Sequence, residues 1–159
     1  MTRREREITD IAEMVEILNN SKVLHLGLVD KGMPYIVPMN YGYEMDEGRL
    51  TIYLHGAYKG YKMDVIKQNP VCCFEMECGL APFEGDIACR YGMIYQSLMG
   101  RGEIKIIDDM QEKKKALKLL MLEQTGKDFE FSDPMANAVC VMRIDVSEYT
   151  AKHRPMPQK

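Results

Sequence analysis

A strand followed by a helix without a capping residue, between Arg49 and Pro70, constrains the fold of this chain most strongly. The apolar stretch 49–56 predicts a strand, and residues 59–68 predict a helix of about three turns that ends before Asn69-Pro70. Ser, Thr, Asp and Asn usually satisfy the free N–H groups of a first helical turn. None of these residue types occurs between His55 and Lys62. The start of this helix therefore predicts an anion-binding site, which we call the phosphate seat.

Two lysines, Lys59 and Lys62, accompany this helix start. A positive charge beside free N–H groups favours a bound phosphate. A pair of lysines on a helix is more often a solvated surface, and it is the missing cap after the His55-Gly56 turn that favours a phosphate site. A strand that leads into a phosphate seat indicates a nucleotide-like cofactor.

Short strands dominate the rest of the pattern. Strands are predicted at 22–30, 34–44, 49–56, 71–78, 92–107 and 138–149, and helices at 9–20, 59–68 and 108–124, with Asp10 and Asp108 as caps and Gly126 after the last helix. The first three strands, at short spacing, predict an antiparallel meander. About six antiparallel strands with flanking α-helices predict a mainly β fold, closed as a small barrel.

Proline and glycine mark irregular points in these strands. Pro38 removes a ladder donor, which indicates an edge strand or a bulge in the second strand. Gly100 and Gly102 indicate a bend, a bulge or the close approach of another group in the strand 92–107. Residues 78–91 contain Gly and Pro and are predicted to form a loop.

The bulk properties limit the classes of function. A chain of 159 residues predicts one domain, placed at 1–150, followed by a loose polar tail at 151–159. The net charge of −3 and the pI of about 5.7 argue against nucleic acid as the main partner. The apolar runs are too short to span a membrane, and the first residues lack the apolar region of a secretory signal. A cytoplasmic protein is expected.

The five cysteines do not predict a metal centre. Their number is odd, and no CxxC pair occurs, so the paired ligands of a zinc site are missing. We therefore expect reduced thiols and no metal site. Cys72 and Cys73 are neighbours in a predicted strand and should point to opposite faces.

A few polar residues stand at informative places. His55 closes a predicted strand, where its side chain is either satisfied by the backbone or placed beside a ligand as a proton donor or hydrogen-bond partner. Pro38, Met39 and Asn40 interrupt a strand, whose free backbone groups could meet the edge of a ligand. Ser97, from its sequence position alone, is best interpreted as an exposed polar residue. Because nucleophile motifs are missing, redox chemistry would have to come from a bound cofactor.

Five segments in fixed order resemble a known family: REREITD, VLHLGLVDKGMPYIVPMNYGY, LTIYLHGAYKGYKMDVIKQNPVCCFE, CRYGMIYQSLMGRGEI and VMRIDVSEYTAK. They are similar to the flavin-binding proteins related to the nitroimidazole-resistance (Nim) proteins, in the pyridoxamine 5'-phosphate oxidase-like superfamily. The resemblance covers nearly the whole chain. It implies an FMN-binding split β-barrel that works as a homodimer, with the flavin at the subunit interface.

The resemblance also implies roles for individual residues. Val37, Pro38, Met39 and Asn40 would line the flavin ring from one strand, and Leu54, His55 and Gly56 from its neighbour. Lys59 and Lys62 would hold the phosphate. Ser97 falls where the family uses a polar residue against the flavin, which reverses the interpretation from its position alone. His55 matches the histidine associated with the active site of Nim proteins.

One departure from the family narrows the expected activity. True pyridoxamine 5'-phosphate oxidases carry a C-terminal signature with tryptophan, and this chain has no Trp. We therefore expect a flavin-dependent oxidoreductase that passes electrons to nitroaromatic compounds, and no oxidation of vitamin B6. Two alternatives stay open: a non-catalytic flavin carrier or sensor, and binding of FAD or haem in the same groove.

Overall fold

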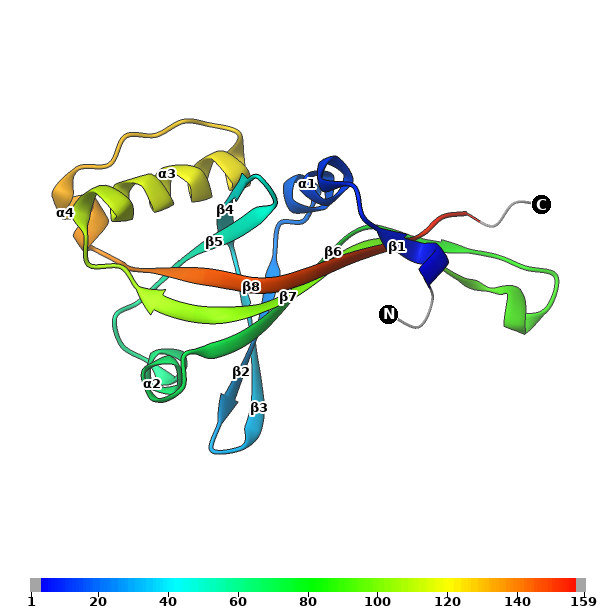
Figure 1. The fold of residues 1–159 in the computed structure, drawn as a ribbon, viewed down its shortest axis with the longest axis horizontal. Coiled ribbons are helices and arrows are strands. Elements are labelled where there is room, and N and C mark those ends of the chain that lie inside the picture. The colour runs from blue at the N-terminus through cyan, green and yellow to red at the C-terminus, as the bar shows by residue number, and fades with distance from the viewer. Residues whose placement is uncertain (1–3, 157–159) are drawn as a thin grey trace.

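The computed structural model of the chain describes residues 4–156 and shows a mainly β fold with flanking helices (Figure 1). The strands are β1 Glu7–Ile8, β2 Leu24–Asp30, β3 Met33–Met39, β4 Tyr41–Asp46, β5 Arg49–Gly56, β6 Val71–Phe83, β7 Gly92–Ile106 and β8 Cys140–Arg154. The α-helices are α1 Ile11–Asn20, α2 Tyr61–Gln68, α3 Met110–Thr125 and α4 Asp133–Asn137, and short 3₁₀ turns cover Arg4–Arg6 and Ala88–Arg90. The predicted class is confirmed, with more strands and helices than expected.

All eight strands belong to one antiparallel sheet, whose order is β3-β2-β6-β7-β8-β5-β4, with β1 paired to β8. β3 and β4 stand at the two ends of this order, yet only Asn40 separates them in the chain. The segment 33–46 is thus one strand bent at Asn40 that joins the two ends of the sheet, as a barrel requires.

This bend corrects two predictions from the sequence. The first three predicted strands do not form a meander, because β3 pairs with β2 whereas β4 pairs with β5. The predicted strand 34–44 is divided at Asn40 rather than at Pro38. Pro38 does lie on an edge strand, as expected, since β3 pairs only with β2.

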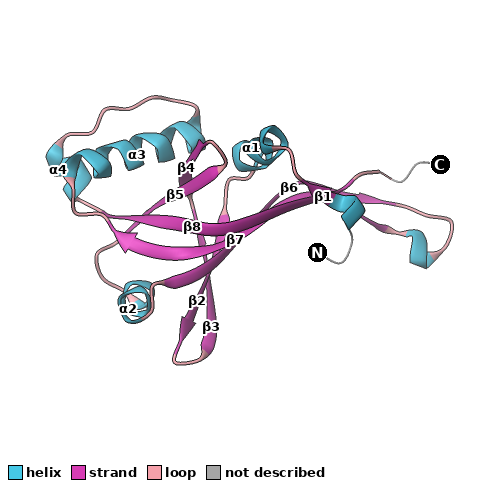
Figure 2. Ribbon diagram, viewed as in Figure 1, coloured by secondary structure: helices cyan, strands magenta, loops and turns pink. Residues whose placement is uncertain are grey.

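The apolar side chains form a main core and a smaller second cluster. The main core fills the space enclosed by the strands and α1, and includes Leu26, Leu54, Phe74 and Leu98. The second cluster lies where α3 and α4 cover β5 and β8 (Figure 2), and consists of Tyr53, Ile107, Ala116, Leu117, Ala136 and Val141. β5 is therefore covered on both faces, with Tyr53 and Leu54 pointing to opposite sides.

The helix ends follow the expected capping chemistry with one shift. The Asp10 side chain accepts a hydrogen bond from the Ala12 N–H at 2.9 Å and caps α1 as predicted. α3 is capped by Asp109 and not by Asp108, because the Asp109 side chain accepts from the Glu112 N–H at 2.8 Å. Gly126, with φ of 70°, ends α3 in the left-handed conformation as expected.

The hairpin of β6 and β7 is longer than predicted. β6 continues to Phe83, so the first part of the predicted loop 78–91 is a strand, with a register shift between Cys78 and Ala81. The prediction for Gly102 is confirmed, because the pairing of β7 with β8 shifts register between Arg101 and Gly102. Cys72 is buried and Cys73 exposed, which confirms their opposite orientations.

The end of the chain is more ordered than its composition predicts. β8 continues through Arg154, so residues 151–154 of the predicted tail form a strand, and residues 157–159 lie outside the described part. Ala151 is only 1% exposed and pairs with both Ile8 and Leu98. Among residues 4–156, no helix is long and apolar enough to cross a membrane.

Candidate functional site

The junction between β5 and α2 has the geometry that the sequence predicts. β5 ends at Gly56, and α2 begins at Tyr61, two residues later than expected. The N-cap position is Gly60, with φ of 131°, a conformation that favours glycine, and no side chain caps the helix. The first turn of α2 therefore keeps N–H groups free for an anion. The predicted uncapped start is confirmed, and Lys59 lies in the loop before the helix.

Lys62 turns its ammonium group back toward β5. Its Nζ lies 3.0 Å from the Met39 sulfur, and a Cβ atom on Gly56 would stand only 3.3 Å from the same nitrogen. A side chain at position 56 would thus crowd Lys62. Within residues 4–156 this thioether, a weak acceptor, is the one polar contact of the Lys62 ammonium. Burial lowers the pKa of Lys62, as expected for a cation with little compensation.

His55 approaches the same strand end from the other face. By strand alternation it lies on the side of Tyr53, whereas Gly56 and Lys62 occupy the side of Leu54. Its Nδ1 is buried and has no hydrogen-bond partner among the described residues. Burial, and then the charge of Lys62, lower the pKa of His55, so the imidazole is neutral at neutral pH. A buried imidazole nitrogen without a partner can bond to a ligand.

The residues 37–40 of the bent strand, which were predicted to line the flavin, differ in burial and in contacts. Met39 is buried, and Val37 packs partly buried against the core. Pro38 is exposed. The Asn40 amide donates to the Lys22 carbonyl at 3.1 Å and to Gln124 Oε1 at 3.0 Å. The structure therefore brings Met39 to Lys62 and Gly56 but engages the Asn40 side chain elsewhere.

Ser97 stands far from this strand end within one chain. β7 places it in register with Lys152 of β8, whereas Gly56 is in register with Cys140 at the start of β8. Lys152 lies twelve residues beyond Cys140, which is about 40 Å along the strand at roughly 3.3 Å per residue. One chain therefore does not bring Ser97 to Lys62 or His55. Ser97 is also only 6% exposed, so the interpretation from its sequence position, an exposed polar residue, is wrong.

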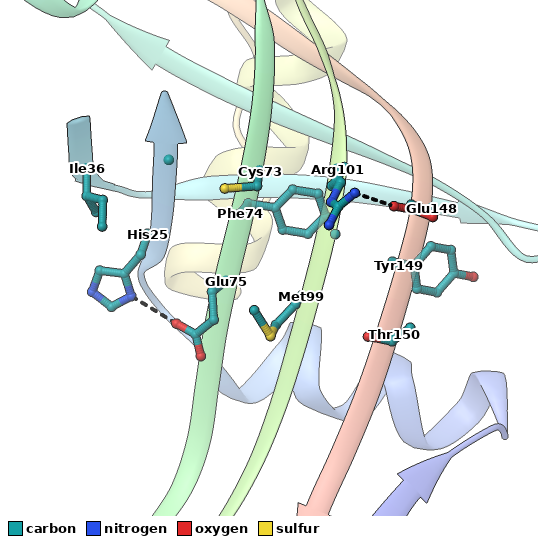
Figure 3. Close-up of a pocket in the computed structure, with 12 residues that line it drawn as sticks. His25, Ile36, Cys73, Phe74, Glu75, Met99, Arg101, Glu148, Tyr149 and Thr150 are labelled. Carbon is teal, nitrogen blue, oxygen red and sulfur yellow. Dashed lines mark hydrogen bonds and ion pairs between the residues drawn. The ribbon is translucent and has the colours of Figure 1, made fainter. Parts of the chain in front are cut away.

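A second feature lies on the outward face of the sheet and was not predicted from the sequence. A groove of ≈ 670 Å³ crosses β2, β6, β7 and β8 and is lined by residues that include His25, Glu75 and Met99 (Figure 3). The Arg101–Glu148 ion pair, at 3.3 Å, lies along it. The groove results from pairing between strands that are distant in the sequence. The signal in the sequence was only the alternation of Glu75 and Glu77 with the apolar Phe74 and Met76.

Comparisons with known proteins agree with this fold. The family model described as pyridoxamine 5'-phosphate oxidase matches residues 10–153. A crystal structure of a candidate 5-nitroimidazole antibiotic resistance protein from Bacteroides thetaiotaomicron is 34% identical, and the match covers 92% of this chain and 86% of that one with a TM-score of 0.79. The comparison with curated proteins found no match.

Two more distant structures share the fold alone. A flavocytochrome from Azotobacter vinelandii is 19% identical, covering 98% of this chain and 73% of its own, with a TM-score of 0.76. An FAD and heme binding protein from Mycobacterium smegmatis is 14% identical, covering 97% and 76%, with a TM-score of 0.79. From the family model and the relative at 34% identity, we conclude that this chain belongs to the pyridoxamine 5'-phosphate oxidase-like family.

Proposed function

We propose that this protein binds a flavin, with FMN preferred, and works as a flavin-dependent oxidoreductase. The observation that carries the proposal is the uncapped start of α2, with the half-buried Lys62 ammonium held against Gly56 and without a carboxylate partner among residues 4–156. A phosphate would supply the missing negative charge. A neutral ligand would leave that charge uncompensated.

The residues around this seat fit a phosphorylated flavin. Lys62 and Lys59 would bind the phosphate together with the free N–H groups of α2. Val37 to Asn40 and Leu54 to Gly56 would line the ring from the two strands, mainly through backbone groups, because the Asn40 amide is already bonded. The bound flavin would accept and pass electrons, while the protein supplies position and excludes water. FAD is the alternative, as in the Mycobacterium smegmatis protein of the same fold.

The position of Ser97 supports a homodimer. Because Ser97 stands about 40 Å along β8 from Cys140 and Gly56, it would reach a flavin only from a second copy of the chain. The outward sheet face offers apolar surface for such a contact, since Ile36 is 66% and Met99 49% exposed. We infer that two copies place Ser97 of one beside the strand end of the other.

His55 is the proposed catalytic residue. Its buried Nδ1 has no partner among the described residues, so the neutral ring can hydrogen-bond to a ligand, take up a proton from solvent and then pass that proton to the reduced substrate. Nitroaromatic compounds are the proposed substrate class, since the relative at 34% identity is named for 5-nitroimidazole resistance. If the protein only carries or senses flavin, the same phosphate seat is needed but His55 has no chemical task.

The proposal is tested with purified protein reconstituted with FMN or FAD. We expect a yellow protein that releases its flavin on heating and supports NAD(P)H oxidation with a nitroaromatic acceptor. His55→Ala should lower turnover while the bound flavin is retained. A protein that takes up neither flavin would refute the binding site. Flavin uptake with unchanged turnover in His55→Ala would refute the catalytic role and favour a carrier or sensor.

A further inference from the structure

Three side chains with metal-binding donors converge on the outward face of the sheet. His25 of β2 stands directly opposite Glu75 of β6 in the strand register, and Glu77 follows Glu75 on the same face. His25 Nδ1 lies 3.3 Å from Glu75 Oε2 and 3.8 Å from Glu77 Oε2. One donor atom from each residue lies within 4.8 Å of the other two. Figure 3 shows His25 and Glu75 turned toward each other at the edge of the groove.

The charges in this cluster do not balance. Among residues 4–156, the His25 imidazole is the one basic group within 4.0 Å of either carboxylate. Two carboxylates therefore share a single imidazole ring. A bound cation would compensate the carboxylates that this single basic group leaves without a counter-charge.

The strands also hold the three donors in place. Each residue lies inside a strand, so its backbone is fixed by pairing between β2 and β6 or between β6 and β7. The side chains of His25, Glu75 and Glu77 are 42%, 34% and 33% exposed, so a hydrated ion can reach them. Three protein donors would leave the remaining coordination positions to water or to a ligand in the groove.

We infer that His25, Glu75 and Glu77 form a binding site for one divalent transition-metal ion. One imidazole nitrogen and two carboxylate oxygens suit ions such as Mn²⁺ or Zn²⁺ better than an all-oxygen site does. The cluster lies away from Lys62 and His55 of the same chain, but Glu77 is in register with Ser97 on the sheet face that the proposed dimer uses. The cysteine pattern predicted no metal site, whereas this cluster arises from the pairing of β2 with β6.

The test uses the full-length protein, treated with a chelator and dialysed, and Mn²⁺ as the probe, because Mn²⁺ prefers oxygen and nitrogen donors to the free thiols of Cys73 and Cys89. Loss of the free Mn²⁺ signal in electron paramagnetic resonance measures binding. We expect one ion per chain. Loss of groups that merely support metal ligands costs roughly 10–100-fold in affinity, so Glu75→Gln and Glu77→Gln should each weaken binding at least about tenfold.

A matched control lies in the same groove. Glu148 is paired with Arg101, so Glu148→Gln removes the same charge from the same face without removing a proposed ligand. It should leave Mn²⁺ affinity unchanged, and circular dichroism should show each variant folded. The proposal is overturned if the wild-type protein binds no Mn²⁺ at millimolar concentration. An equal loss in Glu148→Gln and Glu75→Gln would also overturn it, because the effect would then be general electrostatic attraction.

Discussion

Replacing Lys62 by methionine should affect the stability of the folded chain and its affinity for FMN differently. Methionine has a similar length and lacks the charge, so the packing against Gly56 and Met39 is largely kept. The half-buried ammonium has only the Met39 thioether as a polar contact within residues 4–156, and burial lowers its pKa. Removing the charge should therefore leave the free energy of unfolding of the ligand-free protein unchanged or slightly higher.

The effect on FMN should be opposite in sign and large. A hydrogen bond to a charged group contributes about 1.5–3 kcal/mol. Its loss would raise the Kd for FMN roughly 10–140-fold, at about 1.4 kcal/mol per factor of ten. Riboflavin has the same ring without the phosphate, so its affinity should hardly change. The measurement is a fluorescence titration of each flavin at fixed salt, together with urea unfolding of the ligand-free protein.

Lys67→Met is the matched control, because Lys67 lies in the last turn of the same helix and is exposed. It should alter neither flavin's affinity by more than a small general charge effect. If Lys62→Met leaves the affinity for FMN unchanged, the phosphate does not bind at Lys62 and the start of α2. If FMN and riboflavin lose affinity equally, Lys62 contributes to the ring or to folding rather than to the phosphate.

Three further predictions concern stability. Burial lowers the pKa of His55 below its ordinary 6.5, so as the pH falls the unfolded chain binds this proton before the folded chain does. The free energy of unfolding should therefore decrease as the pH drops below about 6.5. Urea unfolding at several pH values should show that this free energy depends less on pH in His55→Gln. Asp109→Ala should cost about 1 kcal/mol by removing the α3 cap, whereas Asp108→Ala should cost much less in the same assay. A side chain at Gly42 would collide with the backbone of α3 at Leu120, so Gly42→Ala should lower thermal stability by about 1–3 kcal/mol, and an unchanged melting temperature would show that α3 can move away.

Local chemistry in the sequence predicted the parts of the fold that depend on neighbouring residues. Strand 49–56 has its predicted bounds, and α2 begins without a cap because no suitable side chain precedes it. The cap of α3 differs by one position because Asp108 and Asp109 are both adequate acceptors. The register of the preceding strand, which the sequence does not reveal, decides which of them reaches the helix.

Pairing between distant strands could not be predicted in this way. The meander was a reasonable inference from short spacing, but the chain passes from β3 to β4 without pairing them. The residues 151–154 looked like a polar tail because Lys152 and His153 are charged or polar, yet alternate positions face the core and Ala151 is buried. The His25–Glu75 pair was hidden for the same reason, since fifty positions separate the two residues.

The bend at Asn40 has a consequence for how chain length can vary in this protein. Met39 and Tyr41 flank the bend and are both buried. Inserting or deleting one residue there would point the core-facing side chains of one half of the strand to the outer face of the sheet. The tight turn at Lys31-Gly32, which has positive φ, only joins the neighbouring strands β2 and β3, whereas Gly48 of the Glu47-Gly48 turn also accepts a hydrogen bond from the Tyr149 hydroxyl at 2.6 Å. A foreign peptide grafted into the Lys31-Gly32 turn should therefore be displayed on an intact barrel, whereas position 40 accepts a different residue but neither an insertion nor a deletion.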